Sequence, residues 1–211
     1  MAIPGKSRYV MDTKPAQRAG VTLFCSRDRI ACQWTRLVLA EKDVDGARTE
    51  WIAAGKPNHD LAVLNPAATL PTLADRDTVI YPAGIIVEYL DERYPHPRLL
   101  PTDPAARARI RMFIARIERD VFPLAEGILL GRGESKSARK ALTELLLGVY
   151  RMFPARGWFM GQDYNLVDCA WATLFRRLPE LGLKLPNDAQ HAIVKYAERL
   201  FARRAFQAAL K

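Results

Sequence analysis

The first part of the chain alternates between short apolar runs and stretches with helical periodicity. Residues 21–25 form an apolar run that predicts a strand, and apolar positions at helical spacing follow over residues 31–42. The same criteria predict a strand, a short helix, two strands around a charged turn and a helix at residues 47–52, 60–64, 72–74, 79–81 and 85–94. This β-α-β-α-β-β-α order predicts a small α/β domain whose sheet has parallel pairs and a closing antiparallel hairpin.

The pattern changes where prolines crowd together. Pro95, Pro97, Pro101 and Pro104 prevent a helix from continuing and are typical of a semi-rigid connector. Beyond them we find only helical periodicity, over residues 105–121, 138–150, 168–178 and 189–200. We therefore expect four parts: a flexible basic tail (1–20), an α/β domain (21–95), a proline-rich connector (96–104) and an all-helical domain (105–211).

Composition narrows the class of protein. Hydrophobic residues make up 49% of the chain and charged residues 26%, as in globular domains. No apolar run reaches the roughly 20 residues of a membrane helix, so we expect no membrane contact. Cys25, Cys32 and Cys169 are an odd number without CxxC spacing. This argues against a disulfide framework and against a metal site, and it fits a reducing cytoplasm.

The net charge of +9 indicates an anionic partner, nucleic acid or a partner bound to DNA, or simply a solvated basic surface. Lys195, Arg199 and Arg203 recur every four residues and predict a basic stripe along the last helix. No motif that reads DNA bases accompanies the stripe. Nonspecific attraction to the phosphates of promoter DNA is therefore the most that it supports.

Two local motifs stand out in the folded parts. Leu70-Pro71 directly precedes a predicted strand, where a cis X–Pro bond costs little free energy relative to trans. In thioredoxin-like domains such a proline presents the preceding residue's backbone to a thiol ligand, although proline also simply tolerates a strand start. Asn165 and Asp168, three residues apart, have the spacing of a helix capping box, which is a folding signal.

The connector contains a histidine between two prolines. Pro95 and Pro97 restrict the backbone around His96, so a partner that immobilises its imidazole loses little further entropy. The segment therefore suits recognition. The alternative is an ordinary linker with a solvated histidine.

The sequence resembles the stringent starvation protein A family. The most specific segment is Leu-Asp-Glu-Arg-Tyr-Pro-His-Pro at residues 90–97, while segments such as Leu-Asn-Pro at 64–66 and Leu-Val-Asp-Cys at 166–169 are shared by all glutathione S-transferase-like proteins. The resemblance implies the glutathione S-transferase fold, with an N-terminal thioredoxin-like domain and a C-terminal helical bundle. It also implies a homodimer that binds RNA polymerase and its principal sigma factor, with Pro95, His96 and Pro97 as the contact.

The same resemblance raises the question of catalysis. Glutathione transferases activate the ligand's thiol with a Tyr, Ser or Cys near the start of the first helix, where this chain has residues 29–31, Arg-Ile-Ala. Cys32 lies close by and is either a packing residue or the thiol of a glutathione-dependent transferase or reductase. Pro82 and Ala83 replace the acidic-Ser pair that grips the γ-glutamyl end of glutathione.

We therefore expect a vestigial ligand site without catalysis or cofactor, made of Cys32, Leu70, Pro71, Pro82 and Ala83. The resemblance also implies that the dimer forms through the last helix of the first domain and the first helix of the second. We expect that second helix, at 105–121, to offer an apolar stripe and several arginines for the contact. The stripe consists of Ile110, Ile114, Ile117 and Val121.

Overall fold

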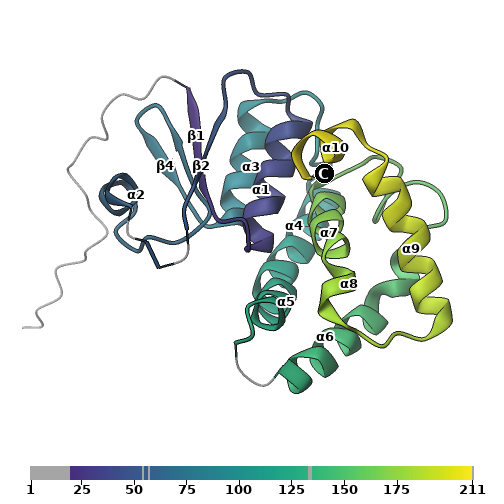
Figure 1. Ribbon diagram of the computed structural model, residues 1–211. Coiled ribbons are helices and arrows are strands. Elements are labelled where there is room, and N and C mark those ends of the chain that lie inside the picture. Colours follow the sequence, from purple (N-terminus) through teal and green to yellow (C-terminus); the bar gives the residue numbers. More distant parts are fainter. Residues whose placement is uncertain (1–19, 54, 57, 133–134, 211) are drawn as a thin grey trace, which may run out of the picture.

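A four-stranded sheet forms the first half of the molecule in the computed structural model, which describes residues 20–53, 55–56, 58–132 and 135–210 (Figure 1). Its strands are β1 (Val21–Cys25), β2 (Arg48–Trp51), β3 (Thr72–Asp75) and β4 (Thr78–Ile80), in the order β2-β1-β3-β4. The expected tail, residues 1–20, lies outside the described residues except for Gly20.

Only one pair of strands in this sheet is parallel. β1 pairs in parallel with β2, whereas β1–β3 and β3–β4 are antiparallel. The expectation of several parallel pairs is therefore wrong. After β2 the chain turns back through the six-residue helix α2 (His59–Leu64) and enters β3 in the opposite direction, without a second full-length crossover helix.

Helices cover both faces of the sheet. α1 (Ile30–Glu41) and α3 (Ala83–Arg93) lie on one face, and α2 lies on the other (Figure 1). β1 is buried throughout, so its side chains alternate between two cores: Leu23 packs with α1 and α3, and Phe24 packs with Leu61 of α2. The predicted β-α-β-α-β-β-α order is confirmed.

The second half of the described chain is helical. No helix or strand lies between Arg93 and Pro104, where the prolines were predicted to form a connector. The elements that follow are α4 (Pro104–Arg116), a π-helical turn (Ile117–Val121), α5 (Phe122–Leu129), α6 (Ser135–Val149), a 3₁₀ turn (Tyr150–Met152), α7 (Leu166–Arg176), α8 (Leu178–Leu181), α9 (Asn187–Phe201) and α10 (Arg204–Leu210). No helix of the described residues is long and apolar enough to cross a membrane.

The helix expected at 105–121 does not end where the periodicity suggested. It passes through the π-helical turn, in which Phe122 N–H bonds the carbonyl of Ile117, and continues as α5. Pro123 has no N–H to donate back to Arg119, so the regular α-helical ladder is interrupted at this point. Its apolar stripe from Ile110 to Val121 is buried inside the chain, with 2–4% of each residue exposed.

A continuous apolar core joins the two halves. Trp34 of α1 is fully buried, packs edge-to-face on Phe122 at 5.8 Å, and donates its indole N–H to the carbonyl of Leu166 at 3.1 Å. α1 thus contacts the sheet on one side and α7 on the other. The sequence divides the chain into two domains, but one shared core holds them together.

The predicted capping box at the start of α7 is confirmed. The side chain of Asn165 accepts from Val167 N–H, and Asp168 reaches back to Asn165 N–H at 2.8 Å. Asp168 is fully buried and also accepts from Phe159 N–H and from the hydroxyl of Tyr196. Burial raises the pKa of Asp168 to about 6, although these hydrogen bonds act in the opposite direction.

The raised pKa makes a testable contribution to stability. A carboxyl whose pKa is higher in the folded than in the unfolded state stabilises the fold below its unfolded pKa and loses that contribution as pH rises through about 6. In the wild-type protein, protonation of Asp168 should therefore make the free energy of unfolding about 1–2 kcal/mol larger at pH 5 than at pH 7.5. D168N cannot titrate, and we expect it to lack that gain in urea unfolding at the two pH values. Equal gains in both proteins would contradict the assignment.

Candidate functional site

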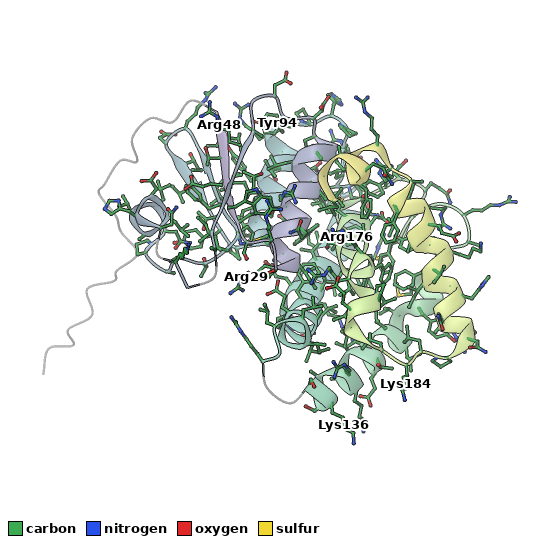
Figure 2. The ribbon with its side chains drawn as sticks, viewed as in Figure 1. Arg29, Arg48, Tyr94, Lys136, Arg176 and Lys184 are labelled. Carbon is green, nitrogen blue, oxygen red and sulfur yellow. The ribbon has the colours of Figure 1, made fainter. Side chains whose placement is uncertain are left out.

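The connector presents Pro95, His96 and Pro97 to solvent. All three residues are exposed, whereas Leu99 and Leu100, just beyond them, are buried in the core. The His96–Pro97 bond is cis. Figure 2 labels Tyr94, which lies half-buried at the end of α3 with the guanidinium of Arg93 5.4 Å from its ring centre. An exposed segment thus follows a packed helix end and precedes a buried pair of leucines.

A buried ion pair contacts the backbone of this segment on its inner side. Lys42, at the C-terminal end of α1, contacts Asp91 of α3 with 2.5 Å between Nζ and Oδ1, and its side chain is fully buried. The same Nζ donates to the carbonyl of Pro97 at 2.5 Å. Asp91 in turn accepts from the N–H groups of Leu99 at 2.7 Å and Leu100 at 3.1 Å. The two side chains therefore satisfy backbone groups on the connector that would otherwise be buried without partners.

The connector is also tied to the helical half. Leu99 accepts through its carbonyl from Leu166 N–H at 3.1 Å, and Leu166 is the residue whose own carbonyl receives the Trp34 indole N–H. One run of contacts thus joins α1, α3, the connector and the start of α7. Because charge-assisted hydrogen bonds in a buried site are strong, the Pro97 end of the exposed segment is fixed in position.

A cleft of about 620 Å³ opens beside Pro97. It lies between the connector, the first turns of α4 and the loop before α7, and Arg98, Arg109 and Arg203 are among its lining residues. Arg203 forms a two-pronged ion pair with Glu41, both contacts 2.7 Å, and its guanidinium lies 3.6 Å from the ring centre of Tyr164.

Lys195, Arg199 and Arg203 do not form the expected stripe of unpaired positive charges along one helix. Arg203 lies beyond the end of α9 and is paired with Glu41. Arg199 donates to the carbonyls of Pro154 and Ala155, and Lys195 pairs with Glu198 at 3.2 Å. Helical spacing correctly placed Lys195 and Arg199 one turn apart, but contacts within the chain engage all three cations.

The residues of the expected vestigial ligand site are not gathered around one cleft. Leu70 lines a cleft of about 320 Å³ with Ser26 and Arg29, and the Leu70–Pro71 bond is cis. Pro71 and Ala83 are buried. Pro82 is exposed and lines a different depression, between α3 and α4.

Cys32 is fully buried beneath the start of α1. Its Sγ accepts from the backbone N–H of Ser26 at 3.2 Å, and the thiol of Cys25 donates to the Cys32 carbonyl at 3.6 Å. Burial raises the pKa of Cys25 well above its usual range. Neither thiol is therefore exposed to solvent.

Two carboxylates from the helical half lie at the N-termini of α1 and α3. Glu126 of α5 accepts from Ala31 N–H at 3.3 Å and lies 3.4 Å from Arg29 Nη1. Glu118, in the π-helical turn, accepts from Gly84 N–H at 3.0 Å. The positive ends of both helices, which would otherwise attract an anionic ligand, already have a carboxylate of the same chain. Burial raises the pKa of both Glu118 and Glu126.

The four residues that organise this region were missed by the sequence analysis. Lys42, Asp91 and Glu118 lie within predicted helices or at their ends, and Glu126 lies in a stretch for which no element was predicted. A charged side chain in such positions normally faces water. No spacing signal links partners that are 49 and 95 residues apart. Only the packing of the helices brings them together.

The comparisons with known proteins agree with this architecture. The model of the glutathione S-transferase N-terminal domain matches residues 21–98, and that of the C-terminal domain matches residues 130–204. The chain is 41% identical to a stringent starvation protein A homolog of Coxiella burnetii, over 92% of this chain and 93% of the other. A homolog from Haemophilus influenzae is also 41% identical, with 93% and 92% covered.

Among solved structures, the chain is similar to a Tau class glutathione S-transferase from mango, Mangifera indica. The TM-score is 0.76 at 26% identity, with 91% of this chain and 93% of the other covered. The architecture of the two chains is therefore the same, and the sequence identity is higher with the stringent starvation homologs than with this transferase.

The buried ion pair can be tested by removing its cation. K42M leaves the carboxylate of Asp91 buried without its charged partner, which should destabilise the fold by about 3–5 kcal/mol. We also expect faster amide hydrogen exchange at Leu99 and Leu100, measured by mass spectrometry, because their acceptor is no longer held in place. K56M removes an exposed lysine and serves as the control. If K42M matched K56M in both stability and exchange, the proposed role of the pair would be wrong.

Proposed function

We propose that this chain, which belongs to the stringent starvation protein A family of glutathione S-transferase-like proteins, regulates transcription in the stress and starvation response by binding RNA polymerase. The proposed site of action is the cytoplasm, and the proposed partner is holoenzyme carrying the principal sigma factor. The observation that carries the proposal is the segment Pro95-His96-Pro97, which is exposed although the buried Lys42–Asp91 pair fixes its base.

Such a segment has the physical properties of a recognition site. Its two prolines restrict the backbone before any partner arrives, so binding loses less conformational entropy than it would for a mobile loop. The imidazole of His96 supplies a hydrogen-bonding group between two small apolar rings. The net charge of +9 would add a nonspecific attraction to promoter DNA near a bound polymerase.

We further propose that the protein does not catalyse glutathione chemistry. The burial of Cys32 and its contact with Ser26 N–H support this, because a nucleophilic thiol must reach the ligand. Glu126 supports it as well, since its carboxylate lies where a thiolate would need the positive end of α1. Pro82 and Ala83 offer no side-chain group to the γ-glutamyl end.

The rival function is a glutathione-dependent transferase or reductase that uses Cys32. Calorimetry with glutathione and an assay with a standard electrophile separate the two functions. We expect no turnover and no binding in the micromolar range. Turnover that disappears in Cys32→Ser would establish the rival.

We propose a homodimer that forms through the exposed face of α3 and α4. The buried stripe of α4 cannot provide this contact, which corrects the expectation from the sequence. The exposed apolar residues Ile85 and Met112, 51% and 71% exposed, line a depression between the two helices together with Arg111. Paired helix faces of this kind are how symmetric dimers bury exposed apolar side chains.

Sedimentation velocity tests the dimer. The mass of the wild-type protein from sedimentation should be about twice the 23.8 kDa of one chain at micromolar concentration. The mass of M112D should be closer to that of a single chain, because the substitution places a charge in the contact. A wild-type species near 23.8 kDa would argue against the dimer.

The polymerase contact is tested by replacing Pro95, His96 and Pro97 together with alanine. The three side chains are exposed, so their loss should change the free energy of unfolding by only about 0.5 kcal/mol. Binding to holoenzyme should weaken by about 2 kcal/mol or more, roughly 30-fold, if the segment is a hot spot. Thermal melting and co-purification with holoenzyme measure the two effects.

P66A, which removes an exposed proline from another loop, is the matched control and should bind like wild type. If the folded triple variant still bound polymerase normally, the contact would lie elsewhere. A large fall in its melting temperature would instead identify the segment as a structural linker.

A further inference from the structure

Four arginines line a cavity of about 360 Å³ beside α1, and one of them, Arg177, is paired with Glu180, which lines the cavity as well. Arg27 follows β1, Arg36 lies on α1, and Arg176 ends α7; together with Trp51 of β2 they line the cavity. We call Arg27, Arg36 and Arg176 the arginine cluster. Figure 2 labels Arg176 near the line where the two halves of the molecule meet.

Two members of the cluster, Arg27 and Arg36, are held in place by neutral groups. The guanidinium carbons of Arg27 and Arg36 lie 4.4 Å and 4.6 Å from the ring centre of Trp51. Gln33 connects the same two residues, since it accepts from Arg36 at 2.8 Å and donates to the carbonyl of Arg27 at 2.9 Å. These contacts orient the guanidinium groups of Arg27 and Arg36 without neutralising their charge.

One carboxylate, that of Glu180, lines the same cavity; it is paired with Arg177 at 2.7 Å, and the other three arginines have no ion pair within the described part of the chain. Arg36 is half-buried, and its burial and the charges of Arg27 and Arg176 lower its pKa. Like charges that face one another across a partly desolvated cavity cost free energy unless an anion joins them.

We infer that the arginine cluster is a binding site for a small anion that carries two phosphate groups. A guanidinium binds phosphate through two parallel hydrogen bonds, and cations from three separate elements can contact more than one phosphate at once. The cavity volume falls at the lower end of the range for small-molecule sites. A cavity of this volume suits a compact ligand.

Calorimetry on the full chain tests the site with inorganic pyrophosphate as the probe. Sodium sulfate at matched ionic strength is the single-anion reference, and magnesium is omitted because it would complex the probe. Pyrophosphate should bind at least tenfold more tightly than sulfate. R36Q and R176Q should each weaken pyrophosphate binding at least tenfold, and their melting temperatures establish that they are folded.

K136Q removes one positive charge at an exposed position of α6, well separated from Arg176 in Figure 2, and should bind the probe like wild type. Equal affinity for sulfate and pyrophosphate, or unchanged binding in R36Q and R176Q, would overturn the proposal. A gel shift with duplex DNA distinguishes the other source of phosphate. Loss of DNA binding in the two variants, with no binding of pyrophosphate to wild type, would assign the cluster to DNA and overturn the small-ligand site.

Discussion

The buried ion pair between Lys42 and Asp91 is the interaction on which the arrangement of the two halves depends. It joins the end of α1 to α3 and satisfies three backbone groups of the connector. A buried charge is tolerated only when its partners are complete, so the connector cannot move away without leaving two ions unsatisfied. From Leu99 the same contacts lead to α7 and to Trp34 in the shared core. The exposed Pro95-His96-Pro97 segment is therefore an outward turn of a tightly held part of the fold.

A second pair of contacts underlies the proposal that this chain does not catalyse glutathione chemistry. Glu118 and Glu126 join the helical half to the N-termini of α3 and α1, and helix N-termini are places that favour anionic ligands. These two carboxylates thus both connect the halves and occupy the helix N-termini that would otherwise favour an anion. In the proposed function these two helix ends therefore serve to join the halves, and the partner contact is assigned to the exposed surface segment instead.

The sequence predicted the fold well where the signal is local. Apolar runs located the strands, helical periodicity located α1, α3, α6, α7 and α9, and the spacing of Asn165 and Asp168 predicted the capping box. The sequence analysis failed where contacts between residues far apart in the chain determine which side chains are buried. The stripe from Ile110 to Val121 is inward-facing, a choice that periodicity alone cannot make, and Pro123 changed the helix type without ending the helix. Lys42 and Glu126 resemble surface charges in the sequence, and only tertiary packing buries them.

The central claim is that the exposed segment above the Lys42–Asp91 pair is the surface that meets RNA polymerase. Site-specific photo-crosslinking tests it most directly. A photoreactive residue is placed at position 96 or, for comparison, at position 66, and the purified protein is irradiated with holoenzyme. The account predicts a crosslink to a polymerase or sigma subunit from position 96 and none from position 66. Crosslinks from position 66 alone, or none from position 96 in a complex that still assembles, would contradict it.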